Sequence, residues 1–494
     1  MIDTQAIRNK ILDLAMRGQL TEQLPEDGTA EELYQKIQEE KQSLIKFGKI
    51  KKGKKLPEIE DTEIPFEIPE NWKWVRLQEI TSNETLNDGN WVLSNDMVDN
   101  GPVKLIQLGS IGDLKYRDKG FKYLTNQRFD ELNGKQIYPG YLLINRLVAD
   151  KMLLCIIPEI KGILITAVDV CWVAPQDNNY NIKYLMYALA SSCVQQRVKE
   201  VGYGVTRFRI SKSNLINIPF PFPPLAEQQR IVEKIDQAFS LLDTIDALQA
   251  QYADNLTALK AKLIDAAIQG KLTKQLPEDG TAEELYDRVQ EEKTDILKER
   301  KGRVDKIIKE VGDDVPYDIP AHWKWIRFGE LGLFKKGPFG SALTKSMFVP
   351  KGSNTVKVYE QQHAIKKDPT LGTYYITKEY FDAKMNGFEV KSGDILISCA
   401  GTIGETYVMP DGIEKGIINQ ALMRVTLASG INKRFFQYYF DSNLKSSARA
   451  GNGSAIVNIP PFDVIKNWYF PLAPIEEQER IVTRLEEIFA EMKM

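Results

Sequence analysis

The sequence predicts a mixed α/β (α+β) protein in which two globular domains are separated by an antiparallel two-helix coiled-coil rod. Twelve residues, "QLPEDGTAEELY", occur at 23–34 and again at 275–286, which indicates an internal repeat. From Leu225 to Gln269 there is neither Gly nor Pro, as expected of one long helix. The stretches near 85–200 and 335–450 combine strand-like and helical patterns, which is typical of globular α/β domains.

The repeat extends over most of the chain. "PENWKWVRL" at 69–77 matches "PAHWKWIRF" at 320–328, and "PPLAEQQRIVEKI" at 223–235 matches "APIEEQERIVTRL" at 473–485. Two copies of a unit of about 250 residues therefore make up the chain, which is domain duplication and not a solenoid of short repeats. The connecting segments nearly coincide, whereas the middle segments differ. This pattern is expected if the connectors meet identical partners and the middle domains read different targets.

The connectors are predicted to be helical. Apolar residues recur in steps of three and four between 231 and 266, which is the spacing of a coiled-coil seam. Pro224 precedes this helix and Gly270 follows it, as capping preferences favour, and the helix would be about 65 Å long. In each copy a turn leads to a second helix, for which Thr29 or Thr281 is the predicted N-cap.

The two chain ends complete the rod. Residues 475–494 match the first half of the central helix and residues 5–18 match its second half, so the repeat is cyclically permuted. The split helix is expected to pack antiparallel to the intact one, with the two middle domains at opposite ends of the rod about a pseudo-two-fold axis. The predicted segments are a helical region at 1–65, a middle domain at 66–224, a central helical region at 225–315, a second middle domain at 316–472 and a helix at 473–494.

A glycine loop follows the last long helix of each middle domain. "GYGVTRFRI" at 202–210 and "GNGSAIVNI" at 451–459 share G-x-G and the final Ile, but the residues between them differ. A lone G-x-G usually marks a turn, whereas two in register with different chemistry favour an adjustable contact. The first loop offers Thr206, Arg207 and Arg209, which suit phosphate or guanine acceptors. The second offers Asn452, Ser454 and Asn458, which suit adenine edges or phosphates.

Other polar and basic residues of the middle domains are candidates for contacts with DNA. Those of the first domain are Lys115, Arg117, Lys119, Asn126, Gln127, Asn145 and Arg146. Those of the second domain are Lys335, Lys336, Ser341, Lys345, Gln361, Gln362 and His363. Charge runs of this kind are also found on ordinary solvated faces, and His363 fits an ordinary loop residue equally well. The Lys-rich stretch at 46–55 fits either a solvated linker or a contact with the DNA backbone.

The composition narrows the class of protein. A net charge of −3 gives no global basic signature for nucleic acid, so any DNA binding must depend on local features. No run of 18 or more apolar residues occurs, so no membrane partner is expected. The cysteines match no metal or redox spacing and are predicted to be reduced core residues of a cytoplasmic protein. They are Cys155, Cys171, Cys193 and Cys399.

No catalytic or metal-binding constellation is evident. The chain contains no P-loop motif, and "NIPPF" at 458–462 differs by an extra Ile from the N-P-P-[YF] loop of adenine methyltransferases, so we interpret it as a loop. His322 lies beside a tryptophan pair, where packing is favoured over catalysis. The paired tryptophans could stack on bases, but their identical placement favours packing of each domain onto the rod. They are Trp72, Trp74, Trp323 and Trp325.

Taken together, the duplicated helix starts, the paired "QLPEDGTAEELY" segments and the "IPENWKW" and "IPAHWKW" stretches resemble the specificity subunits of type I restriction–modification enzymes. "GPFGSALTKSMF" and "GDILISCAGTIG" of the second domain add to this resemblance, which covers essentially the whole chain. The resemblance implies that 66–224 and 316–472 are target-recognition domains, each reading one half of a bipartite, asymmetric site in double-stranded DNA. It implies that the rod docks two methyltransferase subunits, which bind S-adenosylmethionine and methylate adenine, and that a separate restriction subunit uses ATP and Mg. No cofactor or metal is then expected in this chain.

Three classes of function fit the sequence to different degrees. The first is a non-catalytic DNA-specificity subunit, and the second is a coiled-coil scaffold for protein partners that does not read DNA. The third, a self-contained DNA-modifying enzyme, is largely excluded because the cofactor motifs are missing. Sequence-selective DNA retention by the chain together with its modification partner would separate the first two.

Overall fold

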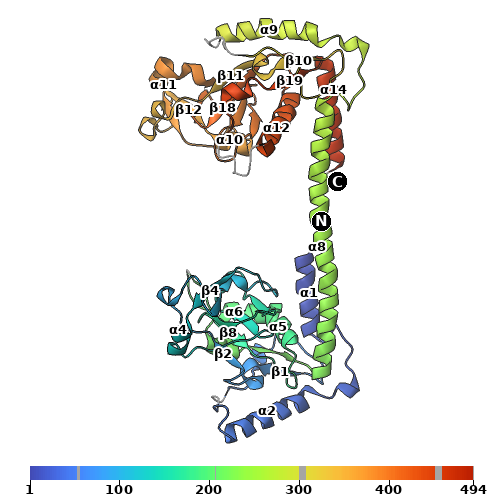
Figure 1. Cartoon of the computed structure of the whole chain (residues 1–494), viewed down its shortest axis with the longest axis vertical. Helices are drawn as coiled ribbons and strands as arrows, with labels where there is room; N and C mark the ends of the chain where they lie inside the picture. The colour runs from blue at the N-terminus through green and yellow to red at the C-terminus, as the bar shows by residue number, and fades with distance from the viewer. Residues whose placement is uncertain (53–55, 206, 300–307, 451–458, 493–494) are drawn as a thin grey trace. The chain divides into compact units, whose positions relative to one another are not determined.

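The computed structural model describes residues 1–52, 56–205, 207–299, 308–450 and 459–492 of the chain (Figure 1). Its contacts divide the chain into a first unit, Met1–Gln251, and a second unit, Tyr252–Met494. The division falls inside one long helix, α8 (Leu225–Ile268), so each unit includes part of that helix. The sequence predicted a helix over 225–269, and this prediction is confirmed. The finer division into five segments stays a prediction.

The first unit begins with helices, continues as a mixed α/β domain and ends on α8. Its helices are α1 (Thr4–Met16), α2 (Ala30–Lys46), α3 (Leu77–Ile80), α4 (Asn126–Glu131), α5 (Ile182–Ala190), α6 (Ser192–Val201) and α7 (Lys212–Ile216). Its strands are β1 (Lys73–Arg76), β2 (Leu86–Asp88), β3 (Val103–Ile106), β4 (Phe121–Leu124), β5 (Leu142–Asn145), β6 (Leu154–Ile156), β7 (Ile163–Thr166), β8 (Val170–Val173) and β9 (Pro219–Phe222).

The second unit has the same plan. Its helices after α8 are α9 (Ala282–Glu299), α10 (Gln361–Lys366), α11 (Lys378–Tyr380), α12 (Lys433–Ala450), α13 (Phe462–Ile465) and α14 (Ile475–Glu491). Its strands are β10 (Lys324–Arg327), β11 (Gly332–Lys336), β12 (Thr355–Tyr359), β13 (Tyr375–Thr377), β14 (Glu389–Val390), β15 (Ile395–Ser398), β16 (Thr406–Val408), β17 (Gly416–Ile418), β18 (Leu422–Leu427) and β19 (Tyr469–Leu472).

The sheets of the two units correspond except for β14, a strand that the second unit has in addition. One antiparallel sheet has the order β2-β8-β5-β6 in the first unit and β11-β18-β15-β16 in the second. Another has the order β4-β3-β7 in the first unit and β13-β12-β17-β14 in the second, with parallel pairing of β3 with β7 and of β12 with β17. The pairs β1·β9 and β10·β19 join the start of each middle domain to its end. The fold is therefore repeated although the middle sequences share few residues.

In each unit, α8 packs antiparallel against a shorter helix. In the first unit, Arg8 of α1 forms ion pairs with Asp243 and Asp246 at 2.7 and 2.8 Å, while Ile2 bonds further along α8 to Gln249. In the second unit, the ammonium of Lys260 lies 5.8 Å from the ring centroid of Phe489 in α14. The sequence predicted that the two terminal segments pair antiparallel with the two halves of the central helix. Both pairings are present (Figure 1).

A buried carboxylate near the start of each rod helix joins three segments of the repeat. Glu227 of α8 accepts hydrogen bonds from Trp72 Nε1 at 2.8 Å and from Gln23 Nε2 at 2.9 Å. In the second unit, Glu477 of α14 accepts the equivalent bond from Trp323 Nε1 at 2.8 Å. Both carboxylates are fully buried. The first tryptophan of each pair therefore packs onto the rod, as the sequence predicted.

The repeated twelve-residue segment makes the same intrachain contacts in both units. Asp27 receives two hydrogen bonds from Arg230 of α8, at 2.8 and 2.5 Å, and Asp279 receives them from Arg480 of α14 at 2.7 and 2.5 Å. Thr29 caps α2 in a capping box with the third residue of the helix, as predicted. Because both copies need these intrachain contacts, the contacts explain much of the identity between the two segments, and binding to another protein is not needed to explain it.

Within the described residues, no helix is long and apolar enough to cross a lipid bilayer. All four cysteines are free thiols, as predicted, and three of them are buried. Burial raises the pKa of Cys155 to about 12 and that of Cys399 to about 11. These thiols therefore behave as small core residues.

Candidate functional site

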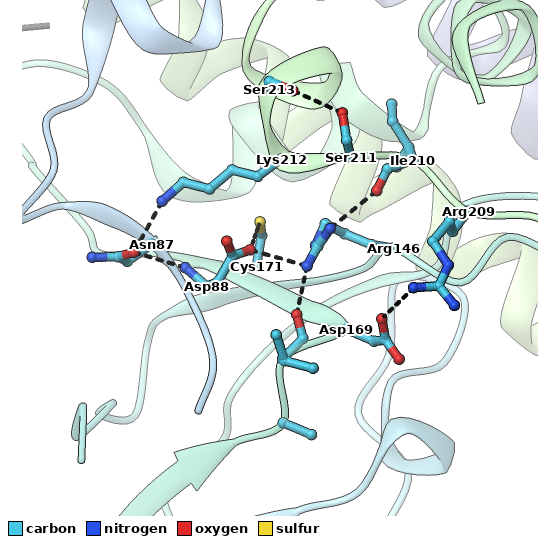
Figure 2. Close-up of polar contacts among 12 residues, drawn as sticks. Asn87, Asp88, Arg146, Asp169, Cys171, Arg209, Ile210, Ser211, Lys212 and Ser213 are labelled. Atoms are coloured by element: carbon cyan, nitrogen blue, oxygen red, sulfur yellow. Dashed lines mark hydrogen bonds and ion pairs between the residues drawn. The ribbon is translucent and has the colours of Figure 1, made fainter. Parts of the chain in front are cut away.

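Three loops meet at one end of the β2-β8-β5-β6 sheet in the first unit. They are the loop after β2 (89–93), the β7–β8 turn (167–169) and the glycine loop at 202–210. Asn90 forms a β-bridge with Ala167, and the Arg209 guanidinium lies 3.9 Å from the Asp169 carboxylate (Figure 2). The glycine loop closes as a hairpin, in which the backbone groups of Tyr203 and Arg209 bond in both directions at 2.9 Å. The turn therefore lies between the other two loops and links them.

Gly204 is required at the tip of this hairpin. Its φ is +104°, and a Cβ there would lie 2.5 Å from the carbonyl oxygen of Arg207. Arg207 is exposed beside it and Arg209 is partly exposed, so both predicted arginines reach the surface. Thr206, the third candidate in this loop, lies outside the described residues.

Arg146, another sequence candidate, holds this loop cluster together. Its guanidinium donates to the carbonyl oxygens of Ile210 at 3.2 Å and Val168 at 2.5 Å, and it lies 3.3 Å from the Asp88 carboxylate (Figure 2). Its neighbour Asn145 is buried, and its side-chain oxygen accepts the backbone N–H of Leu147 at 2.9 Å. Both side chains make intrachain contacts at the end of β5, and a contact of either with DNA stays a prediction.

The remaining candidates of the first unit are exposed but lie elsewhere along the chain. Lys115, Arg117 and Lys119 are exposed in the segment before β4. Asn126 and Gln127 are exposed on α4, where Gln127 donates to Glu131 at 3.0 Å. These residues belong with the strands of the β4-β3-β7 sheet, whereas the hairpin belongs with the β2-β8-β5-β6 sheet.

In the second unit, the candidates around "GPFGSALT" line one groove of about 930 Å³. Lys335 and Lys336 come from β11, and Ser341 comes from the loop that follows it. Lys384, which the sequence analysis missed, enters the same groove from a turn of π-helix at Phe381–Met385. No sequence signal linked this lysine to a groove formed almost fifty residues earlier. Lys345, on the 3₁₀ turn Lys345–Met347 beside the groove, is exposed.

His363 is not available to a ligand, which corrects its place among the candidates. The side chain is fully buried in α10. Its Nε2 lies 2.6 Å from the Leu371 carbonyl oxygen and must donate to it, while Nδ1 accepts the backbone N–H of Glu360 at 2.8 Å. Its neighbours Gln361 and Gln362 are half-buried, and Gln362 donates to Glu360 at 2.9 Å. The cluster therefore stabilises the start of α10.

The second glycine loop is described only at its end. Asn452, Ser454 and Asn458 lie outside the described residues. Ile459, which follows them, donates its backbone N–H to the carbonyl oxygen of Cys399 at 3.1 Å, directly after β15. In the first unit, Ile210 donates in the same way to Arg146 at 3.0 Å, directly after β5. The isoleucine that ends each glycine loop therefore bonds to the same strand end in both units.

His322 and the described acidic and cysteine side chains offer no metal centre. His322 lies 2.8 Å from the Glu477 carboxylate and belongs to the buried contact between the second domain and α14. Within the described ranges, no group of three or more His, Cys, Asp or Glu side chains is placed to hold a metal ion.

Known proteins share this sequence and fold. The chain is 27% identical over 547 residues to the specificity subunit of the type I restriction enzyme EcoAI of Escherichia coli, across 98% of this chain and 88% of that protein. It is 25% identical over 544 residues to the EcoEI specificity subunit of Escherichia coli, with the same coverage. A solved structure concerned with complex assembly and conformational transition of the type I R-M system superposes with a TM-score of 0.54 at 17% identity, over 87% of this chain and 93% of that one, which shows a shared fold.

A model of the type I restriction modification DNA specificity domain matches residues 156–251 and 320–493. These segments make up more than half of the chain and fall in both of its repeats. The resemblance inferred from the sequence is thereby confirmed. The chain belongs to the family of type I restriction modification DNA specificity proteins.

Proposed function

We propose that this chain is the DNA-specificity subunit of a type I restriction–modification complex, and that each unit reads one half of a bipartite, asymmetric DNA site. The observation that carries the proposal is that the two units share one backbone framework but expose different side chains on it. In both units a loop cluster stands at the same end of the same sheet. The first unit presents Arg207 and Arg209 there, whereas the second presents a groove with Lys335, Lys336 and Lys384. Arginine and lysine are the side chains that most often contact guanine acceptors and phosphates.

The local charge at these loops matters more than the net charge of −3. Basic side chains that neutralise phosphates supply affinity for any sequence, and contacts with base edges supply selectivity. A scaffold that joins protein partners without reading DNA is not favoured, because it would not need two loop clusters with one framework and different exposed residues.

The proposed partners are two methyltransferase subunits and a restriction subunit. S-adenosylmethionine, ATP and Mg are assigned to those subunits, and this chain contributes no catalytic group. The complex is assigned to the cytoplasm. Support for docking on the helices comes from exposed apolar side chains of α8. Leu241 and Leu248 lie seven residues apart on this helix, as do Tyr252 and Leu259, so each pair projects from nearly the same face. Exposed apolar stripes of this kind indicate contact with another protein.

The test is to replace residues 66–224 with a second copy of 316–474 and to leave the helices intact. The hybrid is expressed with its methyltransferase partner, and the methylated motif is read from genomic DNA. If the repeats are related by the predicted two-fold, the hybrid marks an interrupted palindrome of the second half-site. A hybrid that binds its partner but still marks the original asymmetric site would refute the assignment of one half-site to each unit.

A further inference from the structure

Each unit carries an exposed aromatic side chain at the same position of the repeat, beside its loop cluster. Trp91 is 68% exposed and Phe339 is 88% exposed. Both follow the first strand of the four-stranded antiparallel sheet, and each lies three positions beyond the last residue of that strand, β2 or β11. Neither ring was singled out in the sequence analysis, because the two sequences around them have little in common.

The backbone fixes the two rings in the same way. Gly89 and Gly337, two residues before the rings, donate their N–H groups to the first residue of β8 or β18, namely to Val170 and Leu422, at 2.9 Å. A Cβ on Gly89 would lie 2.2 Å from the Ala167 carbonyl oxygen, and one on Gly337 would lie 1.8 Å from that of Asn419. Only glycine allows this close approach. The loop is therefore pinned against the next strand, and the ring is directed away from the core.

Positive charge lies near both rings. Phe339 lines its groove together with Lys335, Lys336 and Lys384. In the first unit, the loop of Trp91 is joined through the 167–169 turn to the hairpin that carries Arg207 and Arg209.

Three acidic residues close to Trp91 already have basic partners in the first unit. Asp88 lies 3.3 Å from Arg146, Asp169 lies 3.9 Å from Arg209, and Asp96 lies 2.9 Å from Arg128. These ion pairs reduce the repulsion that an approaching polyanion would meet.

We propose that Trp91 and Phe339 are equivalent stacking residues, each of which packs its ring on a base of the half-site bound by its own unit. The inference rests on the proposed function and adds a contact that does not depend on sequence. In duplex DNA the ring reaches a base face by inserting at a base step and partly unstacking it. Every unstacked base presents a π-face, so one aromatic at one position can serve two different half-sites. The hairpin beside Trp91 and the groove beside Phe339 differ from each other, and these are the parts assigned to base selection.

The experiment is a double-mutant cycle between ring and base, measured with the chain in complex with its methyltransferase partner. The DNA probe contains the methylated motif of the wild-type protein. A set of matched probes each lacks one base within the half-sites or the spacer. On intact DNA, Phe339→Ala and Phe339→Leu are expected to weaken binding about 5- to 150-fold, as loss of one stacked base does, while Phe339→Trp stays close to wild type.

At one abasic position, removal of the ring is expected to have almost no further effect, because its partner base is already absent. That position must lie in the half-site of the second unit. Trp91→Ala, with Trp91→Phe as the conservative variant, is expected to identify a position in the other half-site. Tyr138→Ala removes a ring that is 49% exposed before the start of β5, at the other end of that strand from the loop cluster, and serves as the control, with binding unchanged.

The outcomes distinguish the inference from the function on which it rests. A wild-type complex without sequence-selective DNA binding overturns the proposed function, and the inference with it. Selective binding that is unchanged by Phe339→Ala and Trp91→Ala overturns the inference alone. Variants that lose the methyltransferase subunit on gel filtration would assign the rings to protein docking. Additive losses at every abasic position, or equal affinity of the Leu and Trp variants, would overturn base stacking.

Discussion

The buried carboxylate of Glu227 offers the sharpest test of how the repeated segments hold each domain on the rod. Three donors from different segments converge on it: Trp72 Nε1 at 2.8 Å, Gln23 Nε2 at 2.9 Å and Thr21 Oγ1 at 3.1 Å. Substitution of Glu227 by Gln keeps the size and shape of the side chain. It replaces one acceptor oxygen by an NH₂ donor, so at least one donor is left facing another donor.

The magnitude follows from the number and burial of these bonds. A hydrogen bond to a charged group contributes about 1.5–3 kcal/mol, and the bonds that remain become neutral and weaker. Removing the charge also relieves the desolvation of a buried carboxylate, which offsets part of the loss. We therefore expect Glu227→Gln to lower the free energy of unfolding of the first unit by about 2–4 kcal/mol.

The assay is urea unfolding followed by tryptophan fluorescence, with hydrogen exchange to locate the change. Protection should fall in 66–76, in α2 and in the first turns of α8, and should be unchanged in the second unit. Glu233→Gln, which makes the same chemical change at an exposed position of α8, is the control and should change stability by less than about 0.5 kcal/mol. If the two variants unfold alike, the carboxylate does not hold the domain to the rod.

Three further substitutions test the contact of the repeated segment with α8 and the packing around the candidate site. Arg230 lowers the pKa of Asp27 by hydrogen bonding, so Asp27→Asn is expected to cost about 1–2 kcal/mol at pH 7. Because the pKa of Asp27 in the folded protein lies below the unfolded value of 3.8, the difference in unfolding free energy between wild type and variant should vanish as the pH falls through the folded pKa. A difference that persists in urea melts at the lowest pH would contradict the ion pair. Arg146→Ala removes two bonds to backbone carbonyls and should destabilise the first unit by about 2–4 kcal/mol while erasing only the first half-site from the methylated motif. Gly337→Ala should cost about 2 kcal/mol or more in a urea melt, since the new methyl group meets a backbone oxygen, whereas Gly340→Ala, which has open space around it, should be nearly neutral; equal effects would refute the close approach.

The sequence was sufficient for the helical part of the fold. The helix at 225–269 was predicted within one residue of its observed end, because seam spacing, prolines and a following glycine are local signals. The Thr29 cap was predicted on similar grounds, whereas the packing of Trp72 was predicted from the identical placement of the tryptophans in the two copies. The pairing of the strands could not be predicted from the sequence, because β2 pairs with β8 more than eighty residues later and no local pattern identifies that partner.

The same limit explains the outcomes at the candidate site. Arg207 and Arg209 were predicted because two glycine loops occur in register in the sequence, and the structure places both at the surface. Lys384 was missed because its groove is assembled from distant segments. His363 was included because its sequence context left a contact with a base and an ordinary loop position equally open. Its burial depends on the Leu371 carbonyl oxygen, which the chain supplies eight positions later.

Residues that the two copies share because the fold needs them can be separated from residues that are available for docking a partner. Gln23, Asp27 and Trp72 are repeated because each makes an intrachain bond that both copies of the fold need. Their identity therefore does not by itself indicate a partner. Docking of a second protein is better sought on the exposed apolar residues of α8, where Leu248 and Tyr252 have no role in either core. Substitutions there should weaken assembly with a partner and leave the stability of the fold unchanged. Substitutions in the repeated segment should lower the stability of the fold and affect assembly only through it.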